Sequence, residues 1–156
     1  MSFPPPCGLP RRPPWYPAVT VHGLPHVRLV LEAGPALLLS GPNAAAYAGC
    51  GWWRALMAYA PGYADMLDCG DSPGRVLEAL GIGCSALILA SGPAWNDVAE
   101  RAARQCAVLL EARPPTLDLA EPGAARHLAA WLGSANSAAT SGGKHAGHGE
   151  GQSDPR

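Results

Sequence analysis

Four short polar segments of the sequence carry the residue types from which a ligand site could be built. Each follows an apolar run and precedes a segment with helical periodicity: HGLP at 22–25, SGPNAAAYAGCG at 40–51, DCGDSPG at 68–74 and SGPAW at 91–95. Turns of this kind point the N–H groups of a helix N-terminus outward, and they bind ligands in α/β proteins. The candidate ligand-binding residues are Ser40, Gly41, Asn43, Tyr47, Cys50, Asp68, Gly70, Asp71, Ser72, Gly74 and Ser91.

The segment 68–74 is the most specific of the four. Asp68-x-Gly70-x-x-Pro73-Gly74 resembles the first motif of Rossmann-like methyltransferases that use S-adenosylmethionine, including the DxGxxPG form of some RNA methyltransferases. The resemblance is confined to this turn. It implies that these four residues would shape a pocket for the methionine part of the cofactor.

The following strand departs from that family's pattern. It ends in Ala90-Ser91-Gly92, where the family carries an acidic residue for the ribose hydroxyls, and no Asn/Asp-Pro-Pro-Tyr-type motif follows. An ordinary strand-to-helix turn explains the same residues. Asp71 or Ser72 would cap the helix, Pro73 would open it and the glycines would form the turn. The sequence favours the ordinary turn.

The segment 40–51 leads into two tryptophans, Trp52 and Trp53. One interpretation is a lid in which Cys50, near a helix N-terminus, has an acidified thiol. The other is that both tryptophans anchor a helix to the sheet, and the sequence favours it because large aromatics serve mainly in burial. A Cys50–Cys69 pair, or a Cys–His pair with His22 or His26, is a weaker hypothesis for catalysis.

The elements that would position these residues alternate regularly along the chain. Short apolar runs predict strands at 18–23, 35–41, 64–70, 86–91 and 107–112, with a helix after each. The segment 114–122 is expected to be a loop whose leucines cover the core or contact a partner. Alternation of this kind predicts an α/β fold: a parallel sheet of about five strands with helices on both faces, flavodoxin-like or Rossmann-like. We expect a ligand pocket between 40–51 and 68–74, walled by Tyr47 or Trp52.

The two ends of the chain differ from this middle part. Residues 1–17 are rich in proline and predict a disordered arm, whereas 134–156 hold Gly, Ser and His and predict a disordered tail. The α/β domain is therefore expected at 18–133. His145 and His148 in the tail lack the further ligands of a proper metal site, so we expect none.

Composition excludes several classes of partner. The net charge is −1 with 15% charged residues, so we expect neither nucleic acid nor an anionic membrane as partner. No apolar run reaches the roughly 18–20 residues of a membrane helix. The five cysteines form no CxxC pair and no signal peptide is recognisable, which indicates reduced thiols in a cytoplasmic protein. The preference for Arg, Ala, Gly and Pro is typical of a GC-rich bacterial genome.

No set of acid, base, nucleophile and metal ligand converges in the sequence, so the leading hypothesis is a non-catalytic module that binds a small molecule or a protein. The alternative is a transferase that uses S-adenosylmethionine or a nucleotide at the 68–74 turn. A third hypothesis is an interaction protein whose segment RRPPWYP (11–17) binds a partner.

Overall fold

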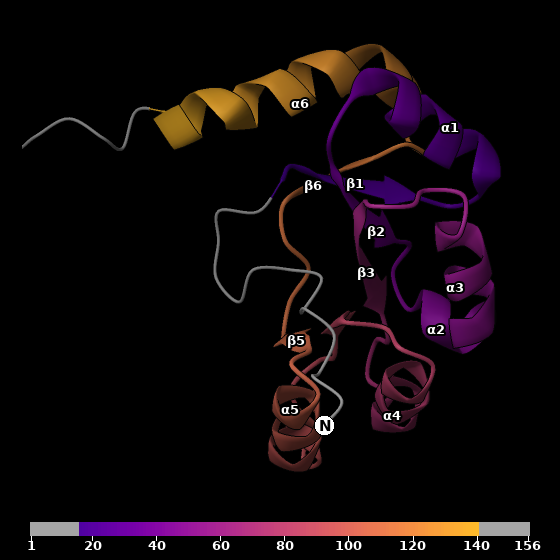
Figure 1. Ribbon diagram of the computed structural model, residues 1–156, viewed down its shortest axis with the longest axis vertical. Coiled ribbons are helices and arrows are strands. Elements are labelled where there is room, and N and C mark those ends of the chain that lie inside the picture. Colours follow the sequence, from indigo (N-terminus) through magenta and orange to yellow (C-terminus); the bar gives the residue numbers. More distant parts are fainter. Residues whose placement is uncertain (1–15, 141–156) are drawn as a thin grey trace, which may run out of the picture.

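Six parallel strands form one sheet in the order β5-β4-β3-β2-β1-β6 (Figure 1). The structure is a computed structural model that describes residues 16–140, with side chains as far as residue 134. The predicted arm lies almost wholly outside the described residues, as does most of the predicted tail. The strands are β1 (Ala18–Val21), β2 (Leu37–Ser40), β3 (Ala64–Asp68), β4 (Ala86–Ile88), β5 (Val108–Leu110) and β6 (Thr116–Asp118).

All five predicted strands are present, and the α/β prediction is confirmed. The sixth strand lies in the segment that was expected to be a loop. β6 is only three residues long and has prolines on both sides, so no alternation marks it in the sequence. Its strand conformation comes from pairing with β1, in which Ala18 lies opposite Thr116 and Thr20 opposite Asp118. Leu117 and Leu119 pack into the core, as one of the two interpretations expected.

Each strand except β5 is followed by at least one helix. The helices are α1 (Leu24–Ala33), α2 (Ala44–Tyr47), α3 (Cys50–Met57), α4 (Pro73–Gly81), α5 (Trp95–Arg104) and α6 (Ala124–Thr140). The break between α2 and α3 falls at Gly49, whose φ of 93° favours glycine. The last helix continues to Thr140, beyond residue 133, at which the α/β domain was expected to end.

All six helices lie on one face of the sheet, whereas the sequence analysis expected helices on both. The buried residues of every helix belong to one core cluster. The strands contribute to this cluster only the residues on one face of the sheet, such as Val19, Leu38 and Leu67. A second cluster consists of strand residues alone. The reason is the strand order: each step from β1 to β5 moves to the next strand in the same direction, and right-handed crossovers then place every helix on the same side. Figure 1 shows the helices as an arc around the strands.

The strand order also requires the sheet to curve. Leu110 and Thr116 are joined by only five residues (111–115), which reach roughly 22 Å when fully extended. In a flat sheet, the outer strands of six would lie about 24 Å apart, before counting the length of a strand. The connection 111–115 therefore crosses the helix-free, concave side, as Figure 1 shows. Six strands with all helices outside resemble a β/α barrel that is open between β5 and β6.

The helix-side core is filled by large side chains. Trp53 is fully buried, and its indole N–H donates to Asp65 Oδ1 at 2.9 Å. Burial raises the pKa of Asp65 above its ordinary value. Cys50, Cys69 and Cys84 are buried too, as small apolar residues are. Within residues 16–140 no helix is long and apolar enough to cross a membrane.

Candidate functional site

The carboxyl edge of the sheet, where the parallel strands end, gathers the strand-to-helix turns. The Asp68 N–H donates to Ser40 Oγ at 2.8 Å, so the ends of β2 and β3 are joined. The Ala90 N–H donates to the Gly70 carbonyl oxygen at 2.7 Å, which joins the turns after β3 and β4. The segments that hold the candidate residues therefore lie side by side. That these residues bind a ligand stays a prediction.

Arg113, from the connection 111–115, spans three strands at this edge. Its guanidinium donates to Asp68 Oδ2 at 2.5 Å, to Thr20 Oγ1 at 3.0 Å and to the Ser40 carbonyl oxygen at 2.9 Å. The other oxygen of Asp68 accepts the Gly70 N–H at 2.8 Å. The Asp68 side chain is 5% exposed, so a cation is needed beside it in this buried place. Both carboxylate oxygens have partners within the protein.

A second polar group lies beside β1 and β6. His22 Nε2 and Asp118 Oδ1 are 2.7 Å apart, and the His22 N–H donates to His26 Nδ1 at 3.2 Å. A Cβ added at Gly41 would lie 2.9 Å from His22 Nδ1 and 2.8 Å from the Tyr47 hydroxyl. His22 Nδ1 and the Tyr47 hydroxyl oxygen therefore both lie beside Gly41, where there is no room for a side chain. Burial and the neighbouring His22 lower the pKa of His26, and Asp118 opposes this effect.

The glycine turn after β3 is filled by a neighbour. Gly70 has a φ of 57°, a left-handed conformation that glycine adopts without strain. A Cβ there would collide with the Asn43 amide oxygen. Asn43 thus occupies the open side of the turn, and the Asp68 carboxylate beside it is bonded to Arg113. In this conformation the turn presents neither a free glycine surface nor a free carboxylate to a cofactor.

The starts of α4 and α5 have no side-chain cap on their N–H groups, and the starts of α1, α2 and α3 lack one as well. Ser72 is the N-cap residue of α4 and Ala94 that of α5, and neither helix has a capping bond from a side chain. Ser72 thus takes the N-cap position, one of the two alternatives expected, but its side chain forms no capping bond. The N-terminal amides of a helix carry partial positive charge, so both helix starts offer donors to a ligand.

Between these two helix starts lies a pocket of about 270 Å³, which we call the β3–β4 pocket. Two of the candidate residues, Asp71 and Ser91, line it. The complete lining is Asp71, Pro73, Leu89, Ala90, Ser91, Gly92, Pro93, Ala94 and Trp95. This pocket lies one strand further along the edge than the pocket expected between 40–51 and 68–74, where the Asn43 side chain packs beside Gly70. Tyr47 faces His22, and Trp52 packs against the helix-side core.

Cys50 does not have the acidified thiol that one interpretation gave it. Its sulfur lies 3.4 Å from the Arg75 carbonyl oxygen, to which its S–H donates, and its side chain is buried. Burial, with the nearby Glu78, raises the pKa of the Cys50 thiol. Burial likewise raises the pKa of Cys69, and it raises the pKa of Cys84 to about 12. None of these thiols is activated as a nucleophile.

No motif in the sequence pointed to Arg113, Thr20 or Asp118, and His22 was indicated only as a partner for a thiol. A signal for Arg113 exists: a basic residue directly after a buried strand lies near the carboxyl edge. Its three bonds depend on a connection that crosses the sheet, which the alternating strand–helix pattern did not predict. Asp118 depends on β6, which that pattern also left out.

Within residues 16–140 no group of three or more His, Cys, Asp or Glu side chains could hold a metal ion. Comparison with protein-family models, with curated proteins and with solved structures yields no match.

Proposed function

We propose that this chain is a small-ligand-binding module whose ligand occupies the β3–β4 pocket. The observation that carries the proposal is the pocket itself, which lies between two uncapped helix starts at the carboxyl edge. In open α/β sheets and in β/α barrels ligands bind at this edge. Elsewhere along the described edge, Asp68 is bonded to Arg113 and His22 to Asp118.

The lining favours binding over catalysis. The described residues around the pocket include one carboxylate, Asp71, and one hydroxyl, Ser91, but no histidine, cysteine, lysine or arginine. General acid–base catalysis would need a second titrating group within hydrogen-bond reach of the ligand. A pocket with donors, acceptors and one aromatic ring suits recognition instead.

The ligand class that fits best is a ring that bears hydroxyl groups, such as a sugar or a nucleoside. Asp71 can accept hydrogen bonds from hydroxyls, the uncapped amides of α4 and α5 can donate to ring or hydroxyl oxygens, and Trp95 offers an apolar surface. A plain anion would suit the amides but would be repelled by Asp71. A protein partner is less favoured, because the pocket is small.

A thermal-shift screen tests this proposal with ribose, glucose, adenosine, orthophosphate, acetate and S-adenosylmethionine as probes. A ligand at a hundred times its dissociation constant adds about 2.7 kcal/mol to the free energy of unfolding, which raises the Tm by several degrees. We expect a rise with a hydroxyl-bearing ring and none with acetate or orthophosphate. A shift with S-adenosylmethionine alone would favour the transferase instead, and no shift with any probe would contradict the proposed ligand class.

The direction in which one substitution changes the affinity distinguishes a hydroxyl-bearing ligand from an anion. Asp71→Asn removes the carboxylate charge, so it should weaken binding of a sugar or nucleoside about tenfold or more, and it should strengthen binding of an anion. The control is Glu100→Gln, which removes a charge further along α5, outside the pocket lining, and should leave affinity unchanged. An equal effect of the two variants would contradict a ligand beside Asp71.

A further inference from the structure

The concave face of the sheet is apolar and carries no described helix. The residues that point to it alternate with those in the helix-side core, and they form the second cluster: Ala18, Leu37, Leu39, Met66, Ala86 and Ile88, with Ala64, Val108 and Leu110 at its margin. The six residues of the cluster are at most 4% exposed, and Leu37, Leu39 and Met66 are fully buried. Their burial therefore needs a cover that none of the six helices supplies.

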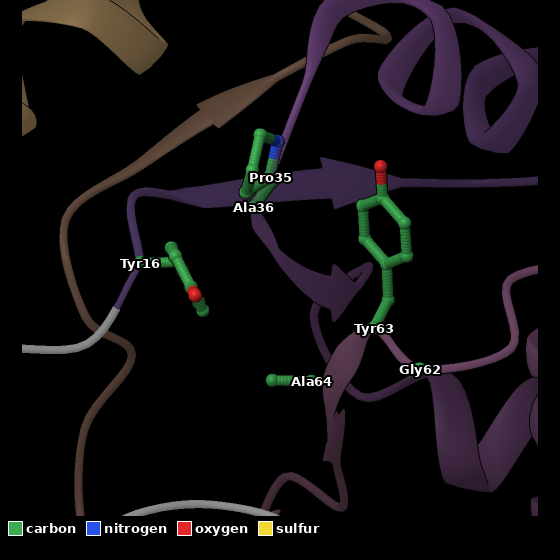
Figure 2. A pocket seen from close by; sticks show the side chains of 6 residues that line it. All are labelled: Tyr16, Pro35, Ala36, Gly62, Tyr63 and Ala64. Carbon is green, nitrogen blue, oxygen red and sulfur yellow. The ribbon is translucent and has the colours of Figure 1, made fainter.

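Two described features mark the ends of this face. At the carboxyl end, Arg113 from the connection 111–115 extends over Thr20 and Asp68. At the amino end lies a pocket of about 240 Å³, lined by Tyr16, Pro35, Ala36, Gly62, Tyr63 and Ala64. Figure 2 shows Tyr16 and Tyr63 on opposite sides of this opening, with Ala64 between them below and Pro35 and Ala36 above. Between the two ends lie Leu39 and Met66.

We propose that the N-terminal segment, residues 1–15, folds back across this face and covers the second cluster. The chain enters β1 through Tyr16, which lines the opening at the amino end of the same face. Fifteen residues in a polyproline II conformation reach about 46 Å, at 3.1 Å per residue. Laid flat, the six strands would span only about 24 Å, so the segment is long enough to cross the curved sheet completely.

The composition of the segment suits this apolar surface. Phe3, Leu9 and Trp15 supply large apolar side chains, and prolines supply further apolar area. Proline has no backbone N–H, so a proline-rich segment can lie on an apolar surface and leave fewer donors without a partner. Arg11 and Arg12 can keep their charged heads in water at the rim of the face. A proline-rich segment thus takes the place that helices have in a two-sided α/β sheet.

A paramagnetic label on Cys7 tests this placement in the full-length chain. Cys50, Cys69 and Cys84 are buried, so a Cys106→Ala background leaves Cys7 as the accessible thiol for the label. We expect the label to broaden the methyl signals of Leu39 and Ile88 on the concave face. The methyl signals of Val27 and Val76, which lie in the helix-side core, should be affected much less. Equal broadening on both sides, or none, would overturn the proposal.

Repeating the broadening measurement after dilution distinguishes a segment of the same molecule from a second copy of the chain. Broadening within one molecule does not change with concentration, so a loss of broadening on dilution would show that another copy covers the face and would overturn the proposal.

Replacing the apolar residues of the segment (Phe3→Ser, Leu9→Ser, Trp15→Ser) should lower the Tm by about 4 °C or more and increase binding of a hydrophobic dye. The matched control, Arg11→Ser with Arg12→Ser, should change neither. An unchanged Tm in the apolar variant, with capture of another protein through the segment, would favour the interaction protein instead.

Discussion

The two halves of the carboxyl edge use their polar groups in opposite ways. In the half formed by β1, β2, β6 and the last residue of β3, the Asp68–Arg113 and His22–Asp118 pairs bond protein groups to one another. In the half formed by the starts of α4 and α5, a pocket lies between the two helix starts, and Asp71 and Ser91 line it. We call these the closed half and the open half. A charged residue at a ligand-binding edge is therefore weak evidence for a ligand site until its partners are known.

The largest loss of stability should come from removing the guanidinium of Arg113 in the closed half. Arg113→Met leaves the buried Asp68 carboxylate without its cation, which should lower the free energy of unfolding by about 3 kcal/mol, measured by urea denaturation. The control is Arg104→Met, which removes an exposed pair with Glu100 and should cost at most about 1 kcal/mol. Adding Asp68→Asn to Arg113→Met should recover part of the loss. Equal losses in the two single variants would show that the closed half is not held by this pair.

A smaller loss should follow a side chain at Gly70, the glycine beside which Asn43 packs. Gly70→Ala places a Cβ at a φ of 57° and against the Asn43 amide, so it should cost about 1–2 kcal/mol. Gly81→Ala is the control, because Gly81 is helical and has no atom within 4 Å of an added Cβ. That variant should be neutral or stabilising. A neutral Gly70→Ala variant would mean that the turn is open and free to accept a cofactor.

The smallest effect should be a pH dependence at His26, in the closed half. Burial and His22 lower the pKa of His26 below its ordinary 6.5 in the folded state. The unfolded chain then binds more protons, so the free energy of unfolding should fall as the pH drops below 6.5 and should stay level above it. His26→Asn should flatten this part of the profile, whereas the exposed His127→Asn should not. Urea denaturation between pH 5 and pH 8 measures it, and identical profiles in wild type and His26→Asn would refute it.

The sequence predicts the elements that follow from local patterns, and it does not predict those that depend on contacts between distant segments. Five strands and the break at Gly49 follow from local patterns, because buried parallel strands are continuous apolar runs and glycines mark turns. The third residue of β6, Asp118, and the bridging Arg113 depend on a connection that crosses the concave face, and local patterns do not encode it. The one-sided arrangement of the helices follows from strand order, which the sequence analysis did not determine.

The candidate site could likewise be predicted only in part from the sequence. Asp71 and Ser91 line the pocket, since turn residues after adjacent strands meet at one edge. Asp68 looked equally suitable from its position, but its carboxylate is bonded within the fold. Only the tertiary contacts distinguish the two aspartates.

The most direct test of a ligand in the open half is a map of amide NMR shifts during titration with adenosine. Our account predicts that the perturbed amides cluster at Gly74, Ser91 and Asn96, at the starts of α4 and α5 and in the turn between β4 and α5, with Asn43 and His22 unaffected. Perturbations centred on His22, Gly41 and Asn43 would contradict the account, because they would place the ligand in the closed half.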